Sequence, residues 1–262
     1  MPSAVYILRR YSGSSGPLQR EEVFVDDHAP STFDATWEIA SDIPGWLTKD
    51  QARLLHQAVG DLDDPLVVEI GSHQGKSTVI LAAAARERGG RVVAVDPFIE
   101  GRLFGGVSTK TKFQNNMEQN GLTESVELLT DYSTRARPGW TRSIDCLYID
   151  GKHDYWTLAD DLKWSVHLPE GAPILIHDCY SSIGVTLGVL AHVLPSRRIR
   201  YESRAGSMAL FKVGKPSWQD RVRILREMPW WVRNVAVKVL LRLRLRRLAA
   251  RVFQHEGPYD PF

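Results

Sequence analysis

The sequence predicts an α/β domain built on a mainly parallel sheet. From Pro65 onward, short apolar runs rich in β-branched residues alternate with helical patterns, which is the order that crossover helices between parallel strands require. Two apolar-polar alternating runs, 198–204 and 208–213, are separated by a short Ala-Gly-Ser segment that favours a hairpin. We therefore predict five parallel strands followed by an antiparallel hairpin, with helices on the flanks.

Each predicted element comes from a local pattern. The parallel strands are expected at 65–70, 91–95, 125–129, 144–149 and 173–177. Helices are expected at 77–86, 112–120, 155–167 and 185–194. Gly121 stands where a left-handed cap would close the second helix, and Pro169 and Gly171 end the third.

Composition and charge divide the chain into three parts. With 262 residues and 43% apolar content, it can bury one large core without disulfides, and its two cysteines indicate a reduced, cytoplasmic setting. Residues 217–262 hold ten Arg and Lys against four Asp and Glu, a surplus of six, so the first 216 residues carry about four net negative charges. We expect an N-terminal arm and the segment leading into the domain (1–42), the domain itself (43–215) and a basic helical tail (216–262). Residues 1–19 are interpreted as a mobile arm, without an apolar run that suits a signal peptide or a membrane span.

A glycine-bearing turn joins the first strand to the first helix. Gly71 and Gly75 lack the Cβ atoms that keep a backbone away from a ligand, and the helix behind them begins with free amides. Their Gly-x-x-x-Gly spacing matches neither the dinucleotide fingerprint nor the phosphate-loop motif. We predict a nucleotide-like ligand at this turn, and a purely structural turn is the alternative.

The ends of the next two strands offer groups that suit the same ligand. Asp96 lies 25 residues beyond Gly71, where a carboxylate can accept hydrogen bonds from ribose hydroxyls. Phe98 is expected to pack on adenine, and Asp131 to reach the adenine edge. A solvated turn carboxylate is the alternative for Asp96.

Together these motifs resemble the class I S-adenosylmethionine methyltransferases. The segments that carry the resemblance are Glu69-Ile-Gly-Ser with Gly75-Lys-Ser-Thr, Val95-Asp-Pro-Phe, Ile149-Asp-Gly-Lys-His-Asp-Tyr155 and Ile176-His-Asp178. With the upstream Ile43-Pro-Gly-Trp-Leu-Thr48, they resemble a bacterial subgroup that includes sugar and natural-product O-methyltransferases. The resemblance covers about 43–213 and implies a Rossmann-like sheet that binds S-adenosylmethionine. Glu69, Gly71, Gly75, Asp96 and Asp131 match the family's cofactor positions, and the predicted cofactor set also includes Ser72, Ser77 and Phe98.

Two carboxylates are expected to meet at the same edge of the sheet. Asp150 ends the fourth strand and Asp178 follows the fifth, and adjacent parallel strands end about 5 Å apart. Like charges so close repel unless a cation lies between them, and oxygen ligands suit Mg²⁺ or another hard divalent ion. The resemblance extends to metal-dependent O-methyltransferases, although Cys179 stands where catechol-type relatives carry an amide.

Histidines near this edge are candidates for the base. We favour His153, which follows Asp150 on a loop, both as proton acceptor and as a further metal ligand, and keep Lys152 in the catalytic set. His177 is expected to point into the helix layer, and His73 to pack near the cofactor. A hydrogen-bonded structural histidine is the alternative for His153 and His177.

The basic tail has three interpretations: packing on the domain or on a second subunit, attachment to an anionic membrane, and binding to nucleic acid. Lys and Arg beside Trp and Leu are typical of membrane-surface helices, while the interrupted apolar stripe also suits packing on the domain or on a second subunit. Nucleic acid is disfavoured because aromatic and basic residues do not interleave across a sheet.

The predicted function is methyl transfer from S-adenosylmethionine to a hydroxyl of a sugar, glycolipid or glycosylated metabolite, assisted by a divalent metal. Two alternatives remain. One is a metal-independent small-molecule methyltransferase with His153 as base, and the other is a catalytically silent module recruited through its tail. We expect a cytoplasmic protein that can lie at the inner membrane surface.

Overall fold

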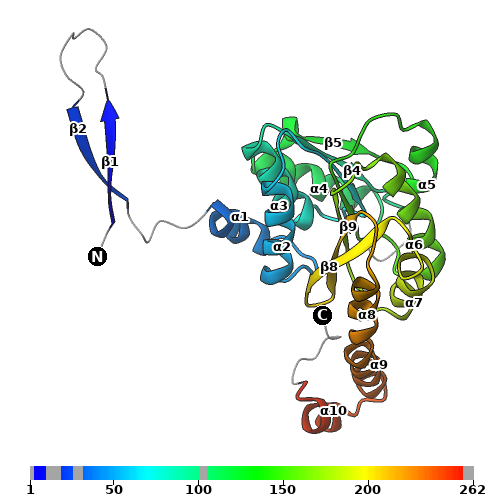
Figure 1. Ribbon diagram of the computed structural model, residues 1–262. Coiled ribbons are helices and arrows are strands. Elements are labelled where there is room, and N and C mark those ends of the chain that lie inside the picture. Colours follow the sequence, from blue (N-terminus) through cyan, green and yellow to red (C-terminus); the bar gives the residue numbers. More distant parts are fainter. Residues whose placement is uncertain (1–2, 10–18, 26–31, 101–104, 256–262) are drawn as a thin grey trace.

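A seven-stranded sheet forms the centre of the molecule in the computed structural model, which describes residues 3–9, 19–25, 32–100 and 105–255 (Figure 1). Its strands are β3 (Leu66–Ile70), β4 (Arg91–Val95), β5 (Val126–Leu129), β6 (Cys146–Ile149), β7 (Pro173–Ile176), β8 (Ile199–Ala205) and β9 (Met208–Val213). Their order is β5-β4-β3-β6-β7-β9-β8, and β9 runs in the opposite direction to the other six strands. The predicted five parallel strands and terminal hairpin are confirmed.

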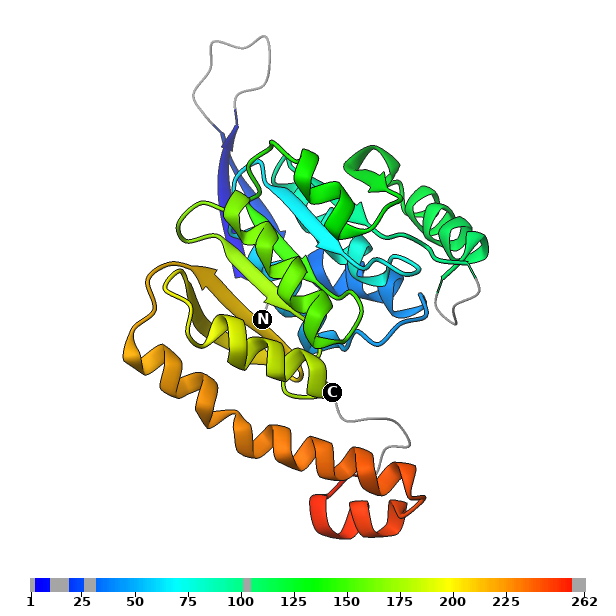
Figure 2. The ribbon, with the colours of Figure 1, turned by 90° about the vertical axis from the view of Figure 1, so that its right-hand side faces the viewer.

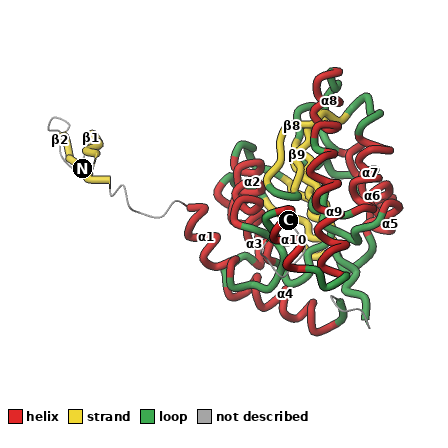
Figure 3. The backbone as a smooth tube through the Cα atoms, turned by 90° about the horizontal axis from the view of Figure 1, so that it is seen from below, coloured by secondary structure: helices red, strands yellow, loops and turns green. Residues whose placement is uncertain are grey.

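Helices cover both faces of this sheet. Figure 3 shows α2 (Lys49–Gly60) and α3 (Lys76–Glu87) on one side of the strands, with α6 (Tyr155–Asp161) and α7 (Ile183–Gly188) on the other. The first face also packs α1 (Thr32–Ser41) and α4 (Val107–Gln119), and the second includes α5 (Ser133–Ala136). The central strands are therefore apolar on both sides, as the adjacent Val67 and Val68, both fully buried, illustrate.

The remaining elements are short turns of helix. Single 3₁₀ turns occur at Thr123–Ser125 and Arg137–Gly139, and the helix expected at 155–167 is α6 continued by a 3₁₀ segment at Leu162–His167. A π-helical segment, Val189–Val193, continues α7.

The largest boundary error concerns α4, which begins five residues before the expected 112. Its first turn is capped from a distance, because the carboxylate of Glu100 accepts a hydrogen bond from the backbone N–H of Val107. Gly106 precedes the helix with a φ of 87°, a conformation suited to glycine. At the other end Gly121 has a φ of 61°, as its predicted capping role requires.

The N-terminal arm is not featureless. We predicted a mobile arm over 1–19, but its described residues Ser3–Arg9 form β1, which pairs antiparallel with β2 (Gln19–Val25). Seven registered pairs join the two strands.

The basic tail forms α8 (Trp218–Arg226), α9 (Met228–Arg242) and α10 (Arg246–Phe253). Leu and Arg alternate over 241–246 as they would in a strand, but here α9 ends at Arg242 and a turn precedes α10. Figure 2 shows α8 and α9 following one border of the domain, with α10 folded back at the far end. Among the described residues, every helix is too short or too polar to cross a membrane.

Candidate functional site

The glycine turn after β3 lies directly against strand β6. Both Gly71 and Gly75 have a φ of 89°, which residues with a side chain rarely adopt. A Cβ atom at Gly71 would lie 2.3 Å from the carbonyl oxygen of Asp150. Glycine at position 71 therefore allows the loop and the end of β6 to pack in contact.

The carboxylate of Asp96 holds this loop in place. Its Oδ2 atom accepts hydrogen bonds from the backbone N–H groups of Ser72 (2.9 Å) and His73 (3.0 Å). Its Oδ1 atom accepts from the N–H of Phe98 at 2.8 Å. The structure thus brings the predicted glycine turn and the predicted ribose-binding carboxylate together.

Glu69 lies beneath the same loop and is fully buried. Its two oxygens accept hydrogen bonds from the hydroxyls of Ser77 and Thr78 in the first turn of α3. Burial raises the pKa of Glu69 to about 7, although these hydroxyls act in the opposite direction. Glu69 and Ser77, both predicted to bind cofactor, are engaged with one another in the interior.

Other predicted cofactor residues differ in exposure. Phe98 is only 7% exposed and packs edge-on against Phe113, with 6.0 Å between ring centroids. Its ring belongs to the core cluster on this face of the sheet, and its packing on adenine stays a prediction. Asp131, which follows β5, is half-buried with a side chain that is 45% exposed, and it lines a cleft of about 520 Å³ together with Trp140 and Arg142. His73, within the loop, lies 5.9 Å from the ring of Trp46.

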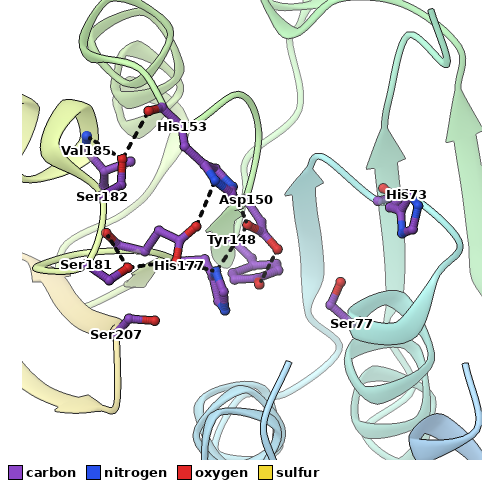
Figure 4. A network of polar contacts seen from close by, with 12 residues as sticks. His73, Ser77, Tyr148, Asp150, His153, His177, Ser181, Ser182, Val185 and Ser207 are labelled. Atoms are coloured by element: carbon purple, nitrogen blue, oxygen red, sulfur yellow. Dashed lines mark hydrogen bonds and ion pairs between the residues drawn. The ribbon is translucent and has the colours of Figure 1, made fainter. Parts of the chain in front are cut away.

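Two carboxylates and two histidines converge at the ends of β6 and β7 (Figure 4). His153 bridges the carboxylates, with Nδ1 2.8 Å from Asp178 Oδ2 and Nε2 3.4 Å from Asp150 Oδ1. From the buried side, His177 Nδ1 lies 3.3 Å from Asp150 Oδ1 and 3.6 Å from Asp178 Oδ1. The predicted meeting of Asp150 and Asp178 is therefore present.

A possible metal-binding group differs from the predicted one in its histidine. Ligand atoms of Asp150, His177 and Asp178 all lie within 4.8 Å of one another. We had expected His153 as the further ligand and His177 in the helix layer. His177 does contact helix α2, where its Nε2 lies 3.3 Å from Gln51 Oε1, while its Nδ1 faces the carboxylates.

Gln51 on α2 holds the His177 imidazole in this orientation, a contact that no motif in the sequence indicates. Its Oε1 accepts from the N–H of Thr48 at 2.9 Å and lies 3.3 Å from His177 Nε2, while its amide nitrogen donates to Ser207. Because Oε1 is an acceptor, Nε2 carries the proton and Nδ1 is the nitrogen that faces Asp150. Thr48-x-x-Gln51 is a capping-box pattern that predicts a helix start, but not a contact with a histidine 126 residues away.

The charges of this group are strongly coupled. Burial alone would lower the pKa of His153, but its hydrogen bonds to Asp150 and Asp178 outweigh burial and raise the pKa to about 10. The two histidines hold the pKa of Asp178 well below its usual range despite its burial. Burial alone would also lower the pKa of His177, but the carboxylates of Asp150 and Asp178 together outweigh burial and raise it. In the absence of another cation, the protonated imidazole of His153 therefore offsets the negative charge of Asp150 and Asp178.

Neighbouring hydroxyls complete the carboxylate shell. Tyr148 donates to Asp150 Oδ2 at 3.1 Å, and the Ser181 hydroxyl donates to Asp178 Oδ1 at 2.9 Å. Asp178 itself has a φ of 56°, an uncommon conformation that holds its side chain at the end of β7.

Two neighbouring residues of interest, Lys152 and Cys179, are not part of this group of ligand atoms. The Lys152 ammonium pairs with Asp154 at 2.7 Å and its side chain is 65% exposed. Cys179 is fully buried, and burial raises the pKa of its thiol, so the thiolate is strongly disfavoured.

Comparison with known proteins agrees with this geometry. A family model described as a methyltransferase domain matches residues 68–179, which include the glycine loop and both clustered carboxylates. The matched segment lies within the central domain and covers less than half of the chain.

Several solved structures have the same fold. An O-methyltransferase from Bacillus cereus, in complex with S-adenosylhomocysteine, is 18% identical, with a TM-score of 0.54 over 72% of this chain and 94% of that one. The O-methyltransferase TomG from Streptomyces achromogenes, involved in tomaymycin synthesis, is 17% identical, with a TM-score of 0.52 over 71% of this chain and 90% of its own. A methyltransferase from Podospora anserina, bound to S-adenosylhomocysteine, is 14% identical with a TM-score of 0.56 over 71% and 89%.

The family match over residues 68–179 and the sheet order show that this part of the chain is a methyltransferase domain with the class I fold. The resemblance drawn from the sequence is confirmed at this level.

Proposed function

We propose that this methyltransferase acts on a hydroxyl oxygen, with a divalent cation bound by Asp150, His177 and Asp178. The acceptor class we propose is a sugar, a glycolipid or a glycosylated metabolite. The observation that carries the proposal is the convergence of these three side chains on one edge of the sheet, beside the cofactor loop. Structural neighbours described as O-methyltransferases support oxygen as the methyl acceptor.

For the cofactor, we assign direct contacts to the loop and to Asp96. A carboxylate offers about four acceptor sites, and Asp96 uses three of them for backbone N–H groups, so one remains for a ribose hydroxyl. Gly71, Ser72 and Gly75 supply backbone that a ligand can approach, and the half-exposed side chain of Asp131 is the candidate for the adenine edge. We assign Glu69 and Ser77 to bracing the loop from beneath.

The donor set fits a divalent cation. Two carboxylates suit Mg²⁺ or Mn²⁺, and the imidazole favours Mn²⁺ or another transition metal over Mg²⁺. The Asp150 side chain is 27% exposed, so water or an acceptor can complete the coordination shell. His177 Nδ1 is buried, and neither of its carboxylate contacts has the geometry of a hydrogen bond. When bound, such an ion would supply positive charge that favours the ionised form of the acceptor hydroxyl.

The chemistry requires alignment and the removal of one proton. A bond forms between the acceptor oxygen and the methyl carbon as the carbon–sulfur bond breaks, and sulfur takes the electron pair. The hydroxyl proton passes to a base, for which His153 is our candidate because its side chain is 49% exposed and contacts both carboxylates.

The metal-independent alternative is weaker on electrostatic grounds. A general base must be unprotonated at the working pH, whereas the ion-free site raises the pKa of His153 to about 10. In that state the imidazole already holds the proton that it would have to accept.

The decisive experiment separates cofactor binding from turnover. Asp150→Asn and Asp178→Asn should bind S-adenosylhomocysteine as the wild type does, but lose turnover on the order of 100-fold or more. Asp160→Asn, which alters a carboxylate paired with Lys163, is the matched control. Turnover would be followed with sugar and glycoside acceptors, with Mg²⁺ and with chelator. Undiminished turnover in chelator and in Asp150→Asn would overturn the metal proposal, and transfer only to nitrogen, carbon or sulfur acceptors would overturn the O-methyltransferase proposal.

A further inference from the structure

The junction of α9 and α10 is exposed, apolar and basic at once. The seven consecutive residues 242–248, which we call the tail tip, are all exposed and comprise four arginines and three leucines. The side chains of Leu243, Leu245 and Leu248 have 62, 45 and 44% of their surface in solvent. Val239 and Val252, on the flanking helices, are about as exposed, at 50 and 56%.

This tip is held on an anchored pair of helices. Asn234 and Val237 of α9 are fully buried, and Arg204 stacks on Trp230 at 4.2 Å. Ala249 of α10 is also fully buried, and Arg233 of α9 donates to the carbonyl of Phe253. The exposed leucines therefore lie on the outer side of a fixed helical pair, which projects at the far end of the tail in Figure 2.

The charge around the tip requires an anionic partner. From 228 to 255 the sequence has seven Arg and Lys and no Asp or Glu. Two copies of this surface would repel, since every side chain that ionises there at neutral pH carries a positive charge. Complementarity therefore favours a partner other than a second tail tip.

We propose that the tail tip binds the surface of an anionic phospholipid bilayer. A bilayer presents phosphate charge and hydrocarbon in adjacent layers, so arginines can stay among the headgroups while leucines enter below them. Nucleic acid would pair with the arginines but would leave the leucines in water. Each arginine near an anionic surface adds to the attraction, so four in one short exposed segment favour reversible attachment. This inference does not depend on the acceptor or on the metal.

The test is cosedimentation of the full chain with vesicles. We expect binding to phosphatidylcholine vesicles that contain about 30% phosphatidylglycerol, and at least about tenfold weaker binding to phosphatidylcholine alone. Binding should also weaken at high salt because the headgroup attraction is screened. Equal binding to both vesicles, or none to either, would overturn the proposal.

Matched variants locate the contact. Leu243→Ser/Leu245→Ser/Leu248→Ser and Arg244→Ser/Arg246→Ser/Arg247→Ser should each lower vesicle affinity about tenfold or more. The controls replace exposed residues elsewhere, Ile39→Ser/Val107→Ser/Val166→Ser and Arg91→Ser/Arg135→Ser/Lys163→Ser, and should leave it unchanged. Circular dichroism would check that each variant is folded, and the vesicle and salt comparisons on the wild type test the proposal without any variant.

Two other outcomes would contradict the bilayer proposal. One is tight binding to duplex DNA or RNA that the leucine variant retains, with weak vesicle binding. The other is a dimer in light scattering that the leucine variant abolishes.

Discussion

Gly71 packs against the carbonyl group of Asp150, so that a Cβ atom on Gly71 would fall 2.3 Å from the Asp150 oxygen and 2.6 Å from its carbonyl carbon. This contact joins the glycine turn after β3, which contains Gly71 and Gly75, to the residue that supplies one of the clustered carboxylates. Backbone contact therefore sets the distance between the proposed cofactor-binding turn and the carboxylate cluster. This close approach is possible because Gly71 has no Cβ atom.

Gly71→Ala should damage both halves. The clash is with backbone, which cannot move aside as a side chain would, and the φ of 89° is itself strained for alanine. We expect a loss of at least about 2 kcal/mol in the free energy of unfolding and a tenfold or greater loss of S-adenosylhomocysteine affinity. Denaturant titration and calorimetry measure the two effects. Gly60→Ala at the end of α2 is the control, because its Cβ would meet nothing within 4 Å, and near-equal effects of both substitutions would contradict the argument.

Gln51→Leu should weaken metal binding without touching the carboxylates. The substitution leaves His177 Nε2, Ser207 Oγ and the N–H of Thr48 without the partner that Gln51 provides, and it releases the orientation of the imidazole. We expect a cost of about 2–4 kcal/mol in stability and about 10- to 100-fold weaker Mn²⁺ binding.

Titration calorimetry with Mn²⁺ measures this effect, and Gln57→Leu on the exposed side of α2 is the matched control. S-adenosylhomocysteine affinity should stay within about twofold, because Gln51 forms no hydrogen bond with the cofactor loop among the described residues. Unchanged Mn²⁺ affinity in a folded Gln51→Leu protein would show that His177 needs no such support, or is not a ligand.

The sequence was informative where a local pattern determines the structure. Apolar runs bounded by glycine and proline predict β3 to β9 to within about two residues, and parallel topology places Asp150 and Asp178 at one edge. The direction in which a side chain points is harder to predict from the sequence. His177 follows a strand whose alternation does not reveal that α2 supplies Gln51, and Phe98 turns into the core because Phe113, from a helix that follows later in the chain, packs on it. Such contacts join residues far apart in sequence, and periodicity does not encode them.

Glu69→Gln should remove a pH dependence of stability. In the folded protein the pKa of Glu69 is about 7 because the side chain is buried, against an ordinary value of 4.5. Below pH 4.5 both states are protonated. As the pH rises from 4.5 to 7, the unfolded chain loses its proton first, so the free energy of unfolding falls, and above 7 the loss is complete. The size is on the order of 3 kcal/mol, at about 1.4 kcal/mol for each pH unit between the two pKa values.

Denaturant titrations of both proteins at about pH 5 and pH 8 check this expectation. Other titrating groups, such as Asp161 and His153, are present in both proteins, so their contribution cancels in the difference. The Glu69→Gln protein should lose less stability between the two pH values than the wild type does. Glu118→Gln, at an exposed position on α4, should behave as the wild type. Identical pH profiles for Glu69→Gln and the wild type would refute the assignment.

Asn234→Ala should show that the tail supports the acceptor side of the site. Asn234 is fully buried on α9, and its amide donates to the carbonyl of Tyr180 at 3.1 Å. Tyr180 and Asp178 both have positive φ, so this bond stabilises a strained turn that presents a carboxylate of the cluster.

Loss of the amide leaves a buried carbonyl without this donor and should cost about 1–3 kcal/mol of stability. Because the turn at Asp178 loosens while the Gly71 loop does not, Mn²⁺ affinity and turnover should fall while S-adenosylhomocysteine affinity holds. Asn115→Ala, exposed on α4, is the control. Equal losses of cofactor and metal affinity would indicate general destabilisation, whereas a selective loss of metal affinity identifies Asn234 as a positioning residue that links the tail to the carboxylate cluster.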